Sequence, residues 1–150
     1  MPKQNVLTKS ITFKNGYKYQ LVDSYAHKLP EWMCLPVTHR FFDITIYEDS
    51  NFWLVAKPGY AWDGCSGPTK DDKTNMRAGL VHDIFYQLLR EKWLPPVISG
   101  YDVRKWADGQ LYTICVADGM PKWRATYYYW AVRRFGDIAA YNPKKLCSAP

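Results

Sequence analysis

A small set of carboxylate and imidazole side chains in the middle of the chain has the types and spacing that could do chemistry. Asp63 stands in a turn-rich loop, and His82 and Asp83 follow in a segment with helical apolar spacing. Asp108 lies in the next such segment. A carboxylate that accepts from one imidazole nitrogen leaves the other free to take a proton from water. Carboxylates with loop carbonyls, here near Gly64, favour calcium over zinc. The set predicts a metal-assisted hydrolytic site.

Helical spacing determines which of these side chains can meet. His82 lies one turn before Tyr86, on a face that continues to Leu89. Asp83 is about 100° further round the helix, near the rim of that face. If this face packs against the face of the next helix that carries Asp108, the Asp108 carboxylate can meet the His82 ring.

The same residues admit a structural interpretation. Asp63 precedes Gly64 and can simply form a turn. His82, Asp83 and Asp108 can instead form a buried polar network that fixes a pair of helices.

Residues 1–57 are predicted to be β-rich. Asn15-Gly16 is a strong hairpin signal between two apolar runs, 10–13 and 17–22. Residues 42–47 alternate with period two, and 52–56 form a further apolar run after a polar turn. We expect antiparallel hairpins in a small sheet or half-barrel.

The rest of the chain is predicted to be helical. A glycine-rich site loop spans residues 58–71, and helices are expected at about 74–92, 102–117 and 121–135. The first two are expected to form an antiparallel pair that carries the His-Asp and Asp motifs. The tail from 137 to 150 is expected to be loose. The fold class is α+β, in one domain over residues 1–150.

The composition of the chain limits the kinds of partner that it is expected to bind. The chain has 150 residues and a net charge of +6, which favours an anionic partner such as a membrane surface or nucleic acid. We expect no transmembrane helix and no signal peptide, because no long apolar run is present. The cysteines lack metal-site spacing and are interpreted as reduced thiols.

The segment from Trp123 to Phe135 combines aromatic and basic residues. Such a helix can lie on a membrane surface or bind phosphates. Alternatively Trp123, Tyr127, Trp130 and Phe135 pack against the sheet while the arginines are solvated. No known nucleic-acid motif appears, so nucleic acid is the less favoured partner.

Several motifs between Tyr60 and Gly136 resemble a family of bacteriophage and prophage proteins classed as a domain of unknown function. They are the loop Asp63-Gly-Cys-Ser66 with Pro68, the helix motif Leu80-Val-His-Asp-Ile-Phe-Tyr86, Ala107-Asp108, and the stretch from Pro121 to Gly136. The resemblance implies a phage-encoded protein located in the host cytoplasm or the virion. A non-enzymatic member would act in assembly, lysis or host takeover by binding a phage or host protein.

The site motifs also look like those of prokaryotic secreted phospholipase A2. That family has an Asp-Gly-Cys-Ser calcium loop, a helical His-Asp-x-x-Tyr and a later Asp. The resemblance implies a catalytic group of His82, Asp108 and Tyr86, with His82 as general base and Asp108 orienting it. It also implies that Asp63, Asp83 and carbonyls near Gly64 bind Ca²⁺, for ester hydrolysis of a lipid.

Overall fold

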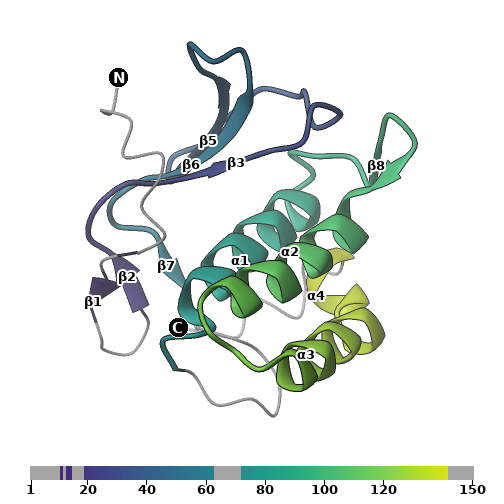
Figure 1. Cartoon of the computed structure of the whole chain (residues 1–150). Helices are drawn as coiled ribbons and strands as arrows, with labels where there is room; N and C mark the ends of the chain where they lie inside the picture. Colours follow the sequence, from purple (N-terminus) through teal and green to yellow (C-terminus); the bar gives the residue numbers. More distant parts are fainter. Residues whose placement is uncertain (1–10, 12, 15–18, 63–71, 142–150) are drawn as a thin grey trace. The chain divides into compact units, whose positions relative to one another are not determined.

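Small antiparallel sheets precede a helical part, so the fold is α+β as predicted (Figure 1). The computed structural model describes residues 11, 13–14, 19–62 and 72–141. The chain divides into two compact units, Met1–Asp63 and Gly64–Pro150.

Short strands make up the described part of the first unit. They are β1 (Phe13–Lys14), β2 (Tyr19–Leu21), β3 (Tyr25–Lys28), β4 (Val37–Thr38), β5 (Phe42–Ile46), β6 (Phe52–Ala56) and β7 (Ala61–Trp62). Hydrogen bonds order them as β1-β2-β7 in one sheet and β3-β6-β5-β4 in another.

Both predicted strand pairings are confirmed. β1 pairs with β2 in the register Phe13 to Leu21, and β5 pairs with β6 in the register Ile44 to Leu54. Phe42 and Ile44 are buried while Asp43 between them is less so, which is the alternation that period two predicts. Strands β3, β4 and β7 were not predicted from the sequence.

Helices dominate the described part of the second unit. They are α1 (Met76–Arg90), α2 (Val103–Ala117), α3 (Lys122–Phe135) and α4 (Asp137–Tyr141). The first three match the predicted segments. The fourth corrects the expectation of a loose tail from residue 137, because residues 137–141 form a turn of helix; residues 142–150 lie outside the described part.

A small hairpin between α1 and α2 was not predicted. β8 (Val97–Ile98) and β9 (Tyr101–Asp102) pair across Ser99 and Gly100, whose φ angles are 50° and 81°. Two consecutive positive φ angles are typical of the tight hairpin turn whose twist suits antiparallel strands. The hairpin ends at Asp102, whose carboxylate accepts a hydrogen bond from the Lys105 backbone N–H and caps α2.

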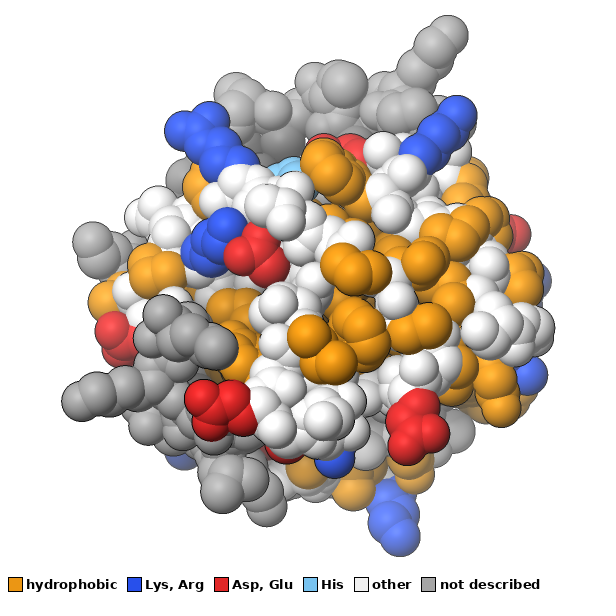
Figure 2. Space-filling model, turned by 90° about the horizontal axis from the view of Figure 1, so that it is seen from above, with side chains coloured by type: hydrophobic (Ala, Val, Ile, Leu, Met, Phe, Trp, Pro, Cys, Tyr) orange, Lys and Arg blue, Asp and Glu red, His pale blue; other side chains and the backbone are white. Residues whose placement is uncertain are grey.

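Four aromatic side chains of α3 are exposed rather than packed in the core of the second unit. Trp123, Tyr127, Trp130 and Phe135 are 75%, 52%, 63% and 72% exposed. Hydrophobic side chains also occur at the surface on the side viewed in Figure 2, where charged side chains are scattered. Within the described part of the chain, each helix is too short or too polar to cross a bilayer.

Candidate active site

Helices α1 and α2 lie side by side (Figure 1) and contact each other. Near the start of α1, Arg77 donates to the Asp118 carboxylate just after α2, with nitrogen–oxygen distances of 3.0 and 2.9 Å. Further along α1, His82 meets Asp108 in the middle of α2. This packing places the polar residues of both helices against each other.

The hydrogen bond between His82 and Asp108 is the centre of the site. Nε2 of His82 lies 2.8 Å from Oδ1 of Asp108. The His82 side chain is 10% exposed, whereas that of Asp108 is fully buried. Because an ionised carboxylate only accepts, Nε2 carries the proton and Nδ1 of the neutral ring presents a lone pair. Within the described residues, Nδ1 has no hydrogen-bond partner.

Tyr86 joins the same carboxylate one helical turn later. Its hydroxyl donates to Oδ1 of Asp108 at 2.6 Å, and its ring lies against the His82 ring with centroids 4.0 Å apart. Burial first, and then the negative charge of Asp108, raises the pKa of the Tyr86 phenol well above its ordinary range. Tyr86 therefore stays protonated and acts as a donor.

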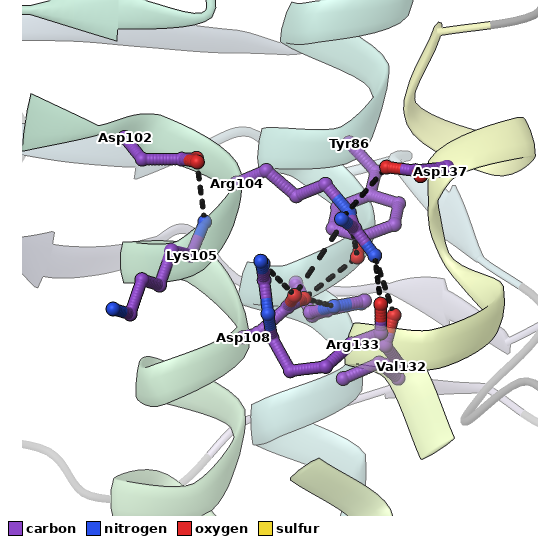
Figure 3. Close-up of polar contacts among 9 residues, drawn as sticks. Tyr86, Asp102, Arg104, Lys105, Asp108, Val132, Arg133 and Asp137 are labelled. Carbon is purple, nitrogen blue, oxygen red and sulfur yellow. Dashed lines mark hydrogen bonds and ion pairs between the residues drawn. The ribbon is translucent and has the colours of Figure 1, made fainter. Parts of the chain in front are cut away.

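Two arginines complete the network (Figure 3). Arg133 of α3 donates to Oδ2 of Asp108 at 2.9 Å. Arg104 of α2 donates from Nε to the Tyr86 hydroxyl at 3.2 Å and lies 3.9 Å from Oδ2 of Asp108. The Arg104 guanidinium also donates to the backbone carbonyls of Val132 and Arg133, each at 2.8 Å, and pairs with Asp137 of α4 at 2.8 Å. One carboxylate thus joins side chains from three helices, and Arg104 extends the network to α4.

These contacts keep Asp108 ionised. Burial alone would raise the pKa of its carboxyl group, because a charge is costly away from water. Hydrogen bonds from His82, Tyr86 and Arg133, together with the charge of His82 when protonated, outweigh burial and lower the pKa below its ordinary value. Asp108 is therefore suited to hold an imidazole in one orientation and to stabilise it when it becomes protonated.

The proposed calcium ligands are only partly described. Asp83 follows His82 on α1 and is partly buried. Asp63 and Gly64 lie outside the described residues. Within the described ranges, no three His, Cys, Asp or Glu side chains gather as metal ligands.

The structure brings together His82, Tyr86 and Asp108, which helical spacing selects, and adds two arginines that sequence reasoning missed. Arg104 precedes Asp108 by one turn of α2, so the spacing of four contained a signal for it. Arg133 was interpreted as a solvated helix residue. Its contact with Asp108 depends on how α3 packs on α2, which no local pattern reports.

Comparisons of the chain with protein-family models, curated proteins and solved structures gave no match. The two resemblances drawn from the motifs therefore remain hypotheses.

Proposed function

We propose that the α1–α2 pair carries a hydrolytic site in which His82 activates water. The observation that carries the proposal is the 2.8 Å contact between Nε2 of His82 and Oδ1 of Asp108, which leaves Nδ1 as the base on a side chain that is 10% exposed. The substrate class is a carboxylic ester of a lipid, as the likeness to phospholipase A2 motifs implies. The phage origin is proposed on the first resemblance.

The chemistry assigned to each side chain follows from its contacts. Nδ1 of His82 takes a proton from water as the water oxygen attacks the ester carbonyl. Asp108 accepts from Nε2 throughout and stabilises the imidazolium, which then gives its proton to the leaving alkoxide. Tyr86 is a positioning residue, because its hydroxyl fixes Oδ1 of Asp108.

Calcium belongs to the proposal through Asp63, Gly64 and Asp83. Bound there, it would polarise the ester carbonyl. The proton transfers assigned to His82, and the orienting contact of Asp108, do not depend on this ion.

A second candidate function is favoured by the burial of the network. The Asp108 carboxylate of α2 has no exposed surface, and its hydrogen-bond partners come from two other helices, α1 and α3. Such a network can serve to fix the helix arrangement of a protein that acts by binding a phage or host partner. In that case His82 has no chemical role.

The deciding test measures release of free fatty acid from phosphatidylglycerol vesicles, with millimolar Ca²⁺ or with EDTA. His82→Gln, which keeps a side-chain amide near Asp108, is expected to lower the rate by about 10²–10⁴-fold, the range for loss of a general base. Tyr86→Phe is the control that keeps the base and is expected to reduce the rate less.

Thermal unfolding of the variants is followed in parallel. A His82→Gln protein that is folded but inactive supports the hydrolase. Undetectable fatty-acid release by the natural chain, or equal release by His82→Gln, overturns it and favours the binding protein.

A further inference from the structure

The outward face of α3 is aromatic, which reverses the usual arrangement of a surface helix. Trp123, Tyr127, Trp130 and Arg134 are spaced at four, three and four residues and fall within an arc of about 60° at 100° per residue. All four are exposed. The buried residues of α3, Ala125 and Tyr128, lie on the opposite side. We call Trp123, Tyr127, Trp130 and Arg134 the aromatic stripe.

Apolar exposure continues beyond the stripe. Phe135 at the end of α3 is 72% exposed, and Ile138 and Tyr141 of α4 are 47% and 42% exposed. Exposing large apolar side chains to water is unfavourable, and a group of them at the surface marks an interaction surface. Tryptophan and tyrosine are enriched where proteins meet the membrane–water interface.

The positive charge of α3 indicates that its partner surface is anionic. The helix contains Lys122, Arg124, Arg133 and Arg134 and has no acidic residue. Arg124 pairs with Asp72 at 2.6 Å and Arg133 with Asp108 at 2.9 Å. The exposed cations at the two ends of the helix are Lys122 and Arg134. Asp137, the next carboxylate along the chain, is paired with Arg104.

We propose that the aromatic stripe binds an anionic lipid surface, with the helix lying in the plane of the interface. Tryptophan and tyrosine rings would sit at the headgroup level, and Lys122 and Arg134 would contact lipid phosphates. Nucleic acid fits less well, because its binding proteins commonly neutralise many phosphates in a row and α3 has only these two cations at its exposed ends. The proposal is independent of hydrolysis by His82.

The test is cosedimentation of the full chain with sucrose-loaded vesicles of phosphatidylcholine, with and without phosphatidylglycerol. The natural chain is expected to bind the anionic vesicles more tightly, and less so as salt rises. Trp123→Ala with Trp130→Ala is expected to weaken binding at least tenfold. Trp93→Ala is the matched control, because Trp93 is 45% exposed on another segment of the same unit.

The charge contribution is tested separately. Lys122→Glu with Arg134→Glu is expected to weaken binding to anionic vesicles at least tenfold, whereas Lys105→Glu, an exposed cation on α2, changes it little. His82→Gln is expected to bind vesicles as the natural chain does, so failure of the hydrolase and failure of the lipid surface are distinguishable.

Three outcomes would overturn the proposal. One is equal vesicle binding by the double tryptophan variant and the natural chain. Another is binding of single-stranded DNA, with no vesicle binding, that the same variant abolishes. The third is a self-associated chain that the variant converts to monomer in light scattering, again with no vesicle binding. Circular dichroism confirms that each variant is folded.

Discussion

At the scale of residues, Asp108 is the most constrained side chain of the site. Oδ1 accepts from His82 and Tyr86, and Oδ2 accepts from Arg133. An asparagine at this position keeps one acceptor oxygen, but it loses the charge and places an N–H₂ group against a donor. Breaking a buried ion pair from one side is far costlier than losing an exposed one.

Asp108→Asn is expected to lower the free energy of unfolding by about 3–5 kcal/mol. Asp137→Asn is the control, because Asp137 also pairs with an arginine but its side chain is 73% exposed, and we expect a loss of about 0–1 kcal/mol. Urea unfolding followed by circular dichroism measures both. Similar losses in the two variants would contradict the central position given to Asp108.

The contribution of Asp108 to the free energy of unfolding depends on pH. The pKa of Asp108 is lower in the folded protein, so between the folded and unfolded pKa values the unfolded chain binds more protons. Its contribution to stability is present above the ordinary aspartate pKa and is lost as pH falls through the folded one. The acid limb of the stability curve should therefore be shallower for Asp108→Asn than for the natural chain.

Residue patterns predicted part of this site. His82, Tyr86 and Asp108 could be predicted because each lies on a helix face that the spacing of apolar residues in the sequence indicates. Arg133 was not predicted, because no face of α3 could be assigned to the site from its spacing and the contact depends on how α3 packs on α2. Asp63 and Gly64 remain predictions, since they lie outside the described residues.

At the scale of elements, the α3–α4 junction packs closely on the site. A Cβ added at Gly136 would overlap the Tyr86 hydroxyl and the Val132 carbonyl and would come within 3.0 Å of an Arg104 guanidinium nitrogen. The φ of Gly136 is −79°, so any residue could adopt the backbone, and the requirement for glycine is one of space. This junction allows α4 to begin next to the polar network.

Gly136→Ala is expected to destabilise the protein by about 1–3 kcal/mol, the usual cost of overpacking. Gly109→Ala is the matched control, because Gly109 lies in α2 beside Asp108 and an added Cβ there meets nothing within 4 Å. Alanine is the better helix former, so this change should stabilise by about 0.5–1 kcal/mol. Thermal unfolding checks both, and stabilisation by Gly136→Ala would refute the close packing.

Long elements were easier to predict than short ones. Helices α1, α2 and α3 are long enough to show a helical spacing of apolar residues. Asp102 and Asp118 bound α2, and Pro121 and Gly136 bound α3. Helix α4 has five residues, which are too few to show a helical spacing of apolar residues. It is held by a tertiary contact, because Arg90 of α1 donates to the Ala139 carbonyl. The β8–β9 hairpin has a local signal in Ser99-Gly100, but this dipeptide lies next to the expected start of the helix at about residue 102.

At the scale of the whole molecule, the calcium hypothesis can be tested without a substrate. A ligand at about 100 times its dissociation constant stabilises the state that binds it by roughly 2.7 kcal/mol. If Asp83 is a ligand, millimolar Ca²⁺ should raise the melting temperature of the natural chain and leave Asp83→Asn unchanged. Zn²⁺ and EDTA are the controls. An equal rise in both proteins would remove Asp83 from the metal hypothesis.

The position of Arg104 has a consequence for cooperativity. The last carbonyls of an α-helix have few partners within the helix. At the end of α3 the Val132 and Arg133 carbonyls both accept from Arg104 of α2, and that of Val132 also accepts from the Gly136 backbone N–H. Fraying of that helix end therefore requires a break in the side-chain network around Asp108. The ends of most helices fray before their middles. The end of α3 instead unfolds together with the buried contact between α1 and α2.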